Sequence, residues 1–561
     1  MDADVWISSI KFKSGLEVSL EKDSILIFVG PNNSGKSLAL REIMQLSTGN
    51  PPVKIIEGLT FESQGTVEDF LEKLANRKHG ENYFPPMQGG GINVSSLKSA
   101  FSYVSEKRMN HIGAIGPFVV KHLETAQRLG LVDPADVVDV LATQVTHPIQ
   151  ILYQDTEKEL KISTLFKQAF GEELIVNFGA GAKIPVHVGK RPNASPKKDR
   201  VSPEYLGELK EMPYLHQQGD GMKSFAGILL SFFSYAYNIN IIDEPEAFLH
   251  PPQAFLLGKM VAADLGTDRQ LIFSTHSEDF LKGLLDTAPG RIVVIRLQRD
   301  EKVQKTSILE NKKLQEIWQD TLLRHSNAFA GLFHKKVVLA ESDSDCQFYN
   351  AIAAAITEHK ELTSPDILYI PTGGKHRFPV VIEALSHLDV PITTIGDFDF
   401  YREESPLKQI LQLVGVDWET VKGDFTAVKK AIDGKRPELD KDQLKEAIDS
   451  IFGKIKDNAV AEGSIKAIQK ELKRASPWAQ AKSSGKAYLP AGNETLSFNR
   501  VQQVLAGKNI FVLDVGEIEA FDKNIGGHGP KWVNEVLKKD LLKARELEEA
   551  RRFVEKCVLG I

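Results

Sequence analysis

Short, continuous apolar runs that end in polar or glycine-rich segments recur along the first part of the chain. Ser24–Val29 (SILIFV) has the pattern of a strand that is buried on both faces in a parallel sheet, and Leu38–Leu46 has helical spacing. Hydrophobic runs of the same kind lead into Asp243 and His276. The pattern therefore predicts an α/β domain whose parallel strands end in polar residues.

The pattern starts again after Arg324, which we interpret as a domain boundary. Lys335–Asp345 is rich in strand-forming residues, and the runs DILYIPTGGK and PITTIGDFDF flank the helical run FPVVIEALSHL. Alternation of strands and helices favours a second parallel sheet. We expect one domain over residues 1–325, interrupted by a helical insertion near 85–170 because spacing is helical from Leu97 to Leu141. The second is expected over 333–561, with a helical insertion near 403–485.

Composition adds limits on the class of protein. The chain has 561 residues, 42% of them hydrophobic and 26% charged, which is typical of soluble globular proteins. Its two cysteines, Cys346 and Cys557, provide neither a disulfide framework nor a zinc site, which fits a reducing compartment. The N-terminus lacks the pattern of a signal peptide, and no apolar stretch reaches eighteen residues. We expect a cytoplasmic protein that does not act in a membrane.

The net charge of −6 argues against a uniformly basic surface, so nucleic-acid binding would depend on local patches. Lys466–Lys486 is one candidate, with several basic residues around Trp478. Gly189–Arg200 is a second basic stretch, but its Pro, Asn and Ser content favours an ordinary exposed loop.

A glycine-rich segment between the first strand and the first helix has the pattern of a phosphate-binding loop. In this context backbone N–H groups at the helix start cradle a phosphate. We expect Lys36 to reach the β and γ oxygens of ATP and Ser37 to hold Mg²⁺. The predicted nucleotide-binding residues are Gly30, Pro31, Asn32, Asn33, Ser34, Gly35, Lys36 and Ser37.

Two later segments supply the remaining groups that ATP hydrolysis requires. The strand within Asn238–Pro251 ends in two adjacent carboxylates: Asp243 is predicted to hold Mg²⁺ and Glu244 to polarise the attacking water. In the run LIFSTHS, His276 is predicted to sense the γ-phosphate.

In this order, these residues resemble the ABC-type ATPases of the SMC and OLD kind. The resemblance implies a signature segment at Gln217–Ser224 (QQGDGMKS), in which Gly219, Gly221 and Ser224 contact nucleotide. In that family the segment completes the ATP site of a second subunit, so the resemblance implies a head-to-tail dimer. Gln144 and Gln150 are both candidates for the glutamine loop.

Four acidic residues of the second domain occur where predicted strands end. They are Glu341, Asp345, Asp397 and Asp399. Open α/β sheets bind ligands at the carboxyl ends of their strands. Since repulsion among these carboxylates would be costly without cations, we expect bound Mg²⁺ or Mn²⁺.

A glutamate, an aspartate four residues on and a later DxD resemble the TOPRIM domain of topoisomerases, primases and OLD-family nucleases. Ser342 stands where the usual pattern has glycine. With the ATPase in front, the whole chain resembles the OLD nucleases, including those of Gabija, retron and PARIS antiphage systems. The resemblance implies a further metal-binding acid, with Glu517 and Glu519 as candidates, and a catalytic lysine, Lys531. His528 is an alternative acid or base.

Our main hypothesis is an ATP-regulated, metal-dependent DNA endonuclease of antiphage defence. The residues leave open whether ATP permits or restrains cleavage, whether RNA is a substrate, and whether dimers pair into tetramers. A helicase, a toxin or retron nucleic acid is a candidate companion. The main alternative is an ATP-driven sensor or scaffold with an inactive TOPRIM domain. A chromosome-maintenance ATPase is disfavoured because the chain lacks long coiled-coil heptads.

Overall fold

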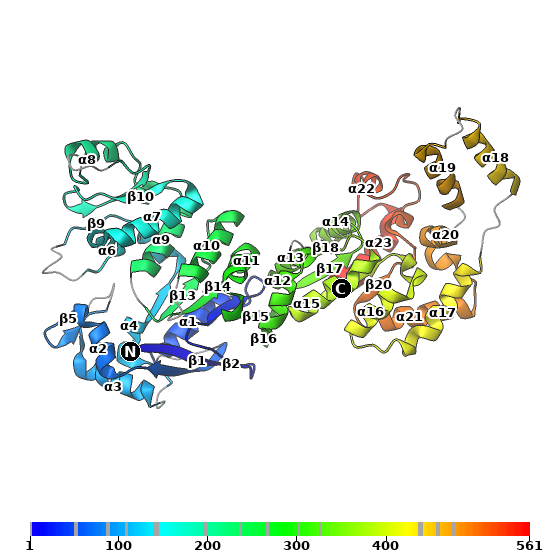
Figure 1. Cartoon of the computed structure of the whole chain (residues 1–561). Helices are drawn as coiled ribbons and strands as arrows, with labels where there is room; N and C mark the ends of the chain where they lie inside the picture. The colour runs from blue at the N-terminus through cyan, green and yellow to red at the C-terminus, as the bar shows by residue number, and fades with distance from the viewer. Residues whose placement is uncertain are drawn as a thin grey trace. The chain divides into compact units, whose positions relative to one another are not determined.

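The structure divides the chain into two compact units, Met1–Arg324 and His325–Ile561. It is a computed structural model that describes residues 3–49, 54–85, 90–106, 110–138, 145–193, 199–234, 237–264, 269–300, 303–324, 327–435, 441–455, 460–473 and 477–561 (Figure 1). Each unit has its own parallel sheet, which confirms the predicted α/β class.

The first unit is built on a six-stranded sheet with the order β16-β15-β3-β14-β13-β8. All neighbours in this sheet are parallel except the β15–β16 hairpin. The strands are β3 (Ile25–Val29), β8 (Val120–Leu123), β13 (Ile239–Asp243), β14 (Gln270–Ser274), β15 (Ile292–Asp300) and β16 (Val303–Leu309). Every residue of β3 is buried, as predicted for its continuous apolar run. The carboxyl ends of β3, β13 and β14 meet at one edge, where the candidate ATP residues follow.

A smaller antiparallel sheet with the order β2-β1-β4 packs on the first through a shared apolar core. Its strands are β1 (Asp4–Phe12), β2 (Glu17–Ser19) and β4 (Ile56–Gln64). Gln270, which is fully buried at the start of β14, accepts a hydrogen bond from Ile7 N at 3.0 Å and donates to Ile7 O at 2.9 Å. One side chain thus satisfies two buried backbone groups of β1.

Helices cover the edges and faces of these sheets. The longer ones are α1 (Lys36–Ser47), α3 (Val94–Ser105), α6 (Pro148–Gln154), α7 (Thr156–Phe170), α8 (Pro203–Lys210), α9 (Asp220–Ser234), α10 (Pro251–Asp264), α11 (Glu278–Thr287) and α12 (Asn311–Gln319). Among the helices that the structure describes, none combines the length and the apolar character that crossing a membrane requires.

The expected helical insertion over residues 85–170 needs correction. Strand β8 lies inside this range and pairs with β13 in the main sheet, and α3 contributes to the core shared with the smaller sheet. Only part of the range, including α6 and α7, is a helical layer outside the sheets. The pattern was misleading because β8 has four residues, of which Lys121 and His122 are polar, so its periodicity is too short to separate it from a helix.

The second unit contains a four-stranded parallel sheet with the order β18-β17-β19-β20. Its strands are β17 (Lys336–Ala340), β18 (Ile367–Pro371), β19 (Ile392–Gly396) and β20 (Ile510–Val512), and the helices between the first three are α14 (Asp343–His359) and α15 (Phe378–His387). This is the β/α alternation that the sequence predicted.

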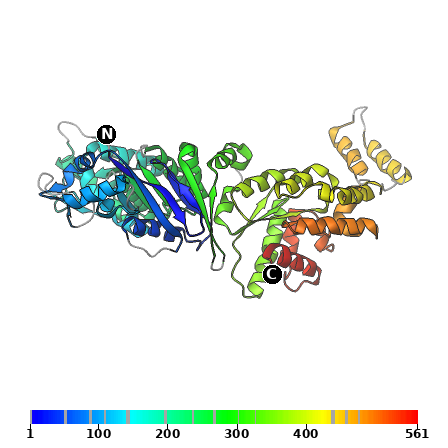
Figure 2. The same ribbon diagram turned by 90° about the horizontal axis from the view of Figure 1, so that it is seen from below.

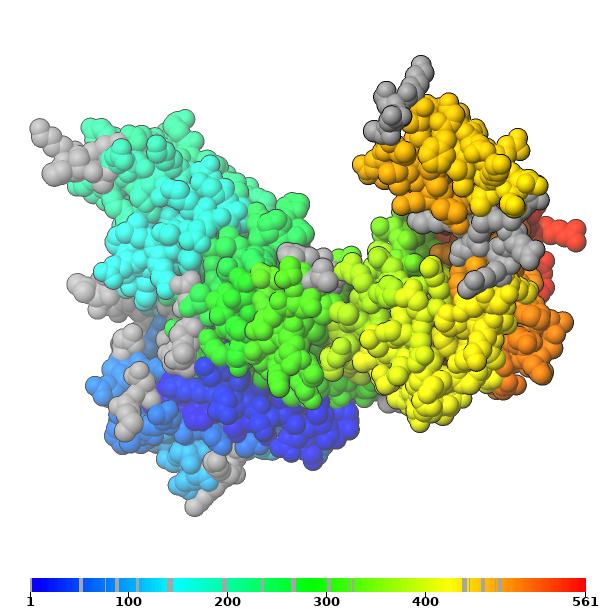
Figure 3. Space-filling model, turned by 45° about the vertical axis from the view of Figure 1, so that its right-hand side comes forward, coloured from blue at the N-terminus to red at the C-terminus, as the bar shows by residue number. Residues whose placement is uncertain are grey.

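A long helical segment separates β19 from β20. It contains α16 (Glu404–Leu413), α17 (Glu419–Asp433), α18 (Lys441–Phe452), α19 (Glu462–Lys473), α20 (Pro477–Ser484) and α21 (Asn493–Ala506). Helices α18 and α19 lie side by side and stand out from the body of their own unit in all three views (Figures 1, 2 and 3). In contrast, α17 packs on α20 and α21, which join the segment to the sheet.

Helices α10 and α11 of the first unit approach closely at two glycines. A Cβ at Gly283 would lie 2.1 Å from the carbonyl oxygen of Phe255, and a Cβ at Gly258 would lie 2.5 Å from that of Phe280. We expect Gly283→Ala to lower the free energy of unfolding by about 1–3 kcal/mol because the helices must separate. Urea denaturation measures this change.

Gly207→Ala in α8 is the matched control. Gly207 is exposed, and its added Cβ would meet nothing within 4 Å. The same substitution should therefore stabilise the protein by roughly 0.4–1 kcal/mol. Equal effects of the two substitutions would contradict the close helix contact.

Candidate ATP and metal sites

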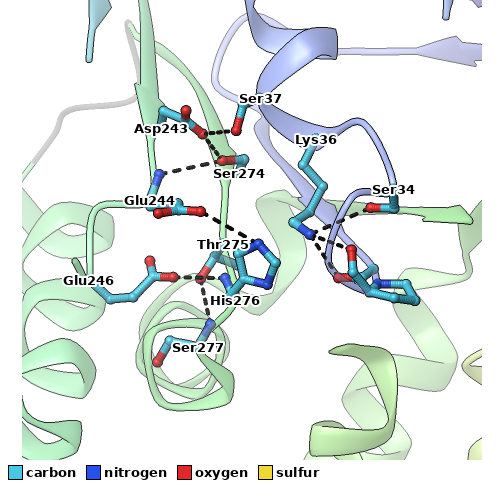
Figure 4. A network of polar contacts seen from close by, with 12 residues as sticks. Ser34, Lys36, Ser37, Asp243, Glu244, Glu246, Ser274, Thr275, His276 and Ser277 are labelled. Atoms are coloured by element: carbon cyan, nitrogen blue, oxygen red, sulfur yellow. Dashed lines mark hydrogen bonds and ion pairs between the residues drawn. The ribbon is translucent and has the colours of Figure 1, made fainter. Parts of the chain in front are cut away.

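The loop between β3 and α1 has the backbone shape that its glycines allow. Gly30 has φ 142° and Gly35 has φ 98°, both in the region that favours glycine. A Cβ at Gly30 would lie 2.0 Å from the carbonyl oxygen of Leu297 on β15, so any larger residue would displace the loop. Figure 4 shows how the loop curls around Lys36, whose Nζ donates to the carbonyl oxygens of Gly30 at 2.8 Å and Pro31 at 2.9 Å. The remaining predicted loop residues, Asn32, Asn33, Ser34 and Ser37, belong to the same strand–turn–helix.

Two residues predicted to hold Mg²⁺ lie in contact at the edge of the main sheet. Ser37, in the first turn of α1, donates its hydroxyl to Asp243 Oδ1 at 3.0 Å. Ser274 at the end of β14 also donates to Asp243 (Figure 4). Parallel pairing of β13 with β14 brings Asp243 and Ser274 into register. Hydroxyl and carboxylate oxygens fit the preference of Mg²⁺ for hard ligands.

Glu244 and His276 face each other beside this pair. Glu244 Oε1 lies 3.5 Å from His276 Nε2 (Figure 4). The backbone N–H of His276 donates to Glu246 at 2.7 Å, which fixes the start of the loop after β14. Burial raises the pKa of the Glu246 carboxyl group to about 7, with the Glu244 charge adding to the effect. The side chain predicted to polarise the attacking water and the one predicted to sense the γ-phosphate thus lie close together.

The signature segment lies at the start of α9. Lys223 N donates to the carbonyl oxygen of Gly219 at 3.2 Å, and Ser224 is fully buried. A Cβ at Gly221 would lie 2.8 Å from the carbonyl oxygen of Phe248, four residues after Glu244. The signature residues thus contact the segment that follows the acidic pair of their own chain.

Of the two glutamine-loop candidates, the structure describes only Gln150. Gln150 Oε1 accepts hydrogen bonds from Thr146 N and His147 N, and its Nε2 donates to Asp136 O. Its polar atoms are occupied in capping α6. Gln144 lies outside the described residues.

Sequence reasoning missed the contribution of β8 and the helix after it, α5 (Thr125–Gly130). Leu123 is in register with Ile242, so His122 and Glu124 flank the end of the strand beside Asp243. Burial lowers the pKa of His122, although the Glu124 and Asp243 charges oppose this shift. Arg128 of α5 contacts the backbone of the acidic pair directly. The only signal in the sequence was a four-residue run, VKHL, with two polar residues between two apolar ones.

In the second unit, adjacent parallel strands bring three predicted metal ligands together. Glu341 follows β17, and Asp397 and Asp399 follow β19; one carboxylate oxygen from each lies within 4.8 Å of the other two. Burial raises the pKa of Glu341 and raises that of Asp397 well above its usual range. Glu341 Oε2 and Asp399 Oδ1 are buried and have no hydrogen-bond partner among the described residues. Unpaired carboxylate oxygens in this arrangement fit Mg²⁺ or Mn²⁺.

Asp345 lies near the acid cluster of Glu341 and Asp397, and it also takes part in capping a helix. As the third residue of α14 it accepts hydrogen bonds from Ser342 N at 2.7 Å and Ser342 Oγ at 2.9 Å, and its own N–H donates to Ser342 Oγ at 3.4 Å, which completes a capping box. Burial raises the pKa of Asp345; the hydrogen bonds from Ser342 oppose the shift, and the nearby Glu519 charge adds to it. Serine in place of the usual glycine therefore caps the helix that carries this acid.

Glu517, Glu519 and His528 form a second group with ligand atoms within 4.8 Å of one another. His528 Nδ1 lies 2.7 Å from Glu519 Oε1, which also accepts a hydrogen bond from Gly529 N. Burial and the Glu519 charge raise the pKa of Glu517. Lys531 is exposed in the first turn of α22 (Pro530–Val536).

Two lysines other than Lys531 contact the acids. Lys482 Nζ lies 2.7 Å from Asp397 Oδ2, and Lys375 Nζ lies 3.2 Å from Asp399 Oδ2. Burial opposes the charge of Lys482, but the neighbouring carboxylates outweigh it and raise the pKa of the ammonium group. Lys482 belongs to the basic stretch that was a candidate for nucleic-acid binding, and nothing in the pattern of that stretch separated it from the exposed lysines.

Close backbone contacts fix the end of α20, the helix that carries Lys482. A Cβ at Gly516 would lie 1.9 Å from the carbonyl oxygen of Lys482, and a Cβ at Gly485 would lie 2.0 Å from that of Asp514. Gly516 O in turn accepts a hydrogen bond from Phe398 N, beside Asp397. The turn after β20 thus fixes the positions of Lys482 and Asp397 relative to each other.

Three other residues of the two basic stretches make contacts inside their own units. Trp478 is buried and donates to Asp433 Oδ1 at 2.8 Å, so it is a packing residue. Arg191 and Arg200 both pair with Glu159, at 3.0 and 2.7 Å.

Comparison with protein families finds two matches along the chain. Residues 137–282 match the family described as "AAA domain, putative AbiEii toxin, Type IV TA system". Residues 332–399 match "Overcoming lysogenization defect protein-like, TOPRIM domain", a range that contains Glu341, Asp345, Asp397 and Asp399. Among curated proteins, none matches this chain.

Solved structures similar to the chain include heads of SMC proteins. The SMC head domain from Thermotoga maritima is 13% identical with a TM-score of 0.27, and the match covers 55% of this chain and 100% of that one. A second similar structure is an Smc head domain with an extended coiled coil bound to the C-terminal domain of ScpA, derived from Pyrococcus furiosus. It is 13% identical with a TM-score of 0.33, and the match covers 56% of this chain and 99% of that one.

The family matches confirm the resemblance drawn from the motifs. An AAA-type ATPase domain is followed by an OLD-like TOPRIM domain, and each contains acids at the ends of parallel strands. The order of the two matched domains is therefore that of an OLD-family fusion of an ATPase domain to a TOPRIM domain.

Proposed function

We propose that this chain is an ATP-regulated, divalent-metal-dependent DNA endonuclease. The observation that carries the proposal is the group of Glu341, Asp397 and Asp399, whose oxygens converge within 4.8 Å in an OLD-like TOPRIM domain. The ATPase domain in the same chain supports nucleotide binding and hydrolysis. We divide the chain into an ATPase domain over residues 1–325 and a nuclease domain over 333–561.

In the nuclease site, Glu341, Asp397 and Asp399 would hold the first divalent cation. Asp345, Glu517 and Glu519 would hold a second. A bound Mg²⁺ or Mn²⁺ supplies charge that stabilises the attacking and leaving oxygens of a phosphodiester. Lys531, exposed at the start of α22, is free of the acid cluster and would contact the phosphate of the substrate.

In the ATP site, Lys36 would exchange its contacts with loop carbonyls for the β and γ oxygens of ATP. Ser37 and Asp243 would hold Mg²⁺ from their shared position. Glu244 would orient the attacking water, with His276 beside it at the γ-phosphate.

We propose a head-to-tail dimer in which Gly219, Gly221 and Ser224 of one subunit complete the ATP site of the other. The nearness of Gly221 to Phe248 supports this, because Phe248 is 54% exposed with φ 71° and lies just after Glu244. An exposed aromatic residue in a strained turn suits an interface. Pairing of dimers into tetramers extends the same proposal.

The biological part of the proposal is a cytoplasmic role in antiphage defence, with DNA as substrate. A helicase, a toxin or retron nucleic acid is the kind of companion that this role would involve. The sensor or scaffold alternative is favoured by one observation: Asp345 Oδ2 is already engaged by Ser342. Cleavage of supercoiled plasmid with Mg²⁺ or Mn²⁺, with and without ATP, distinguishes these functions, since a scaffold would not cut.

Glu341→Ala should lower plasmid cleavage at least about 100-fold because it removes a half-buried carboxylate that would hold the metal. ATP hydrolysis, measured by phosphate release, should stay unchanged because its residues belong to the other domain. Glu358→Ala, an exposed acid on α14, is the matched control and should cut normally. Loss of both activities in Glu341→Ala would contradict separate sites.

Lys36→Ala should weaken ATP binding by at least tenfold, which corresponds to about 1.4 kcal/mol, because the loop loses its cation for the phosphates. Titration with a fluorescent ATP analogue measures the affinity. Lys210→Ala, an exposed lysine at the end of α8, should bind normally. Unchanged affinity in Lys36→Ala would rule out the phosphate-loop assignment.

Lys482→Met should destabilise the metal-free protein by about 3 kcal/mol, because Asp397 loses its paired cation in a buried cluster. Added Mn²⁺ should restore part of this loss, since a divalent ion neutralises the same carboxylates. Thermal unfolding in EDTA and in Mn²⁺ measures both effects.

Lys466→Met is the control for Lys482→Met. Lys466 pairs with Glu462 on the surface of α19 and its side chain is 71% exposed, so its loss should have little effect. If the two variants unfold at the same temperature in EDTA, Lys482 is not the cation of the cluster.

A further inference from the structure

Arg128 is fully buried beside the ATP site although no motif includes it. It lies in α5, directly after the edge strand β8, and its side chain has no exposed surface. A buried arginine is costly to remove from water, so its contacts should account for its presence.

Those contacts are with the backbone of the acidic pair. Arg128 Nη1 donates to the carbonyl oxygen of Asp243 at 2.8 Å, and Nη2 donates to that of Glu244 at 3.0 Å. Nη2 also donates to Thr125 Oγ1 at 3.2 Å, which orients the fork from its own helix. The planar guanidinium group therefore spans two successive peptide groups at the end of β13.

The backbone held in this way is strained at Glu244. Its φ is 45°, in the left-handed region that residues other than glycine adopt rarely. Such a conformation persists only where surrounding contacts enforce it. The hydrogen bonds from Arg128 and the bond from Glu244 N to Ser274 O at 3.1 Å are contacts of this kind.

The guanidinium group of Arg128 keeps its positive charge although it is buried. Burial lowers the pKa of Arg128 to about 10, and the Glu246, Asp243 and Glu244 carboxylates oppose this shift. The side chain is therefore positively charged at neutral pH. Its charge offsets the repulsion among three acids that are close together in sequence and space.

Arg128 also contacts the helix that begins with the signature segment. A Cβ at Gly227 of α9 would lie only 2.3 Å from the carbonyl oxygen of Arg128. The backbone of Arg128 thus packs directly on α9, while its side chain holds Glu244. Arg128 therefore links α9 to the turn that carries Glu244.

We infer that Arg128 is a positioning residue for ATP hydrolysis, which fixes Glu244 in its strained conformation and links it to helix α9. The inference rests on the ATP hydrolysis in the proposed function and is independent of the nuclease. Both terminal nitrogens of Arg128 are engaged by Asp243 O, Glu244 O and Thr125 Oγ1, so its loss should affect turnover much more than binding.

The test compares Arg128→Lys with Arg191→Lys. Arg191 is a matched control because it is also largely buried, pairs with Glu159 and donates to the carbonyl oxygen of Leu174, away from the ATP site. Lysine keeps the charge but cannot donate to two carbonyls in a fixed fork. We expect kcat for ATP to fall roughly 10- to 100-fold in Arg128→Lys, with the affinity for a fluorescent ATP analogue changed by less than about threefold.

A chemical rescue separates positioning from general stability. In Arg128→Ala, added methylguanidinium should restore part of kcat by replacing the missing donors, while urea and NaCl at the same concentration should not. Arg191→Ala should gain nothing from methylguanidinium.

Three results would overturn the inference while wild-type protein hydrolyses ATP. They are an equal kcat in Arg128→Lys and Arg191→Lys, an equal loss of affinity and turnover in Arg128→Lys, and an Arg128→Lys protein that does not fold. Absence of hydrolysis in the wild-type protein would instead count against the proposed ATPase function itself.

Discussion

Repulsion among carboxylates gathered at the ends of parallel strands is the constraint on which both functional regions depend. A parallel sheet brings the carboxyl ends of neighbouring strands to one edge, which is how Asp243 meets Ser274 and how Glu341 meets Asp397. Partial burial then raises the cost of each negative charge. Both units offset this cost with a cation from a segment distant in sequence: the buried Arg128 in the first and the partly buried Lys482 in the second.

The two cations act in different ways. Arg128 donates to backbone carbonyls and leaves the carboxylates of Asp243 and Glu244 available to other groups. Lys482 pairs with the Asp397 carboxylate itself, so it occupies an oxygen that a metal ion would use. The candidate ATP site could therefore bind a cation without losing the Arg128 contacts. A metal ion at the acid cluster would instead have to displace Lys482 from Asp397.

Motifs confined to one strand and its turn could be predicted from the sequence. The loop around Lys36, the acidic pair and the acids after β17 and β19 all follow continuous apolar runs, and local pattern is sufficient to place them. Ser342 was expected as a departure from the family pattern, and its role as a helix cap became visible only with its hydrogen bonds.

Residues that reach a site from far along the chain could not be predicted. Arg128 follows a four-residue strand, and Lys482 resembles any other lysine of a basic helical segment. Their importance comes from packing between elements, which has no periodic signal in sequence. The same limit explains why β8 was expected to be part of a helical insertion.

The glycine contacts after β20 have a consequence for variation among related chains. Gly485 and Gly516 lock the end of α20 against the turn after β20, while α18 and α19 stand away from the body of the unit (Figure 1). Insertions or deletions within that outer pair can therefore accumulate without shifting the ammonium group of Lys482. The lysine is anchored from its carboxyl-terminal side, so evolution can change the length of the segment before it while keeping the charge at the acids in place.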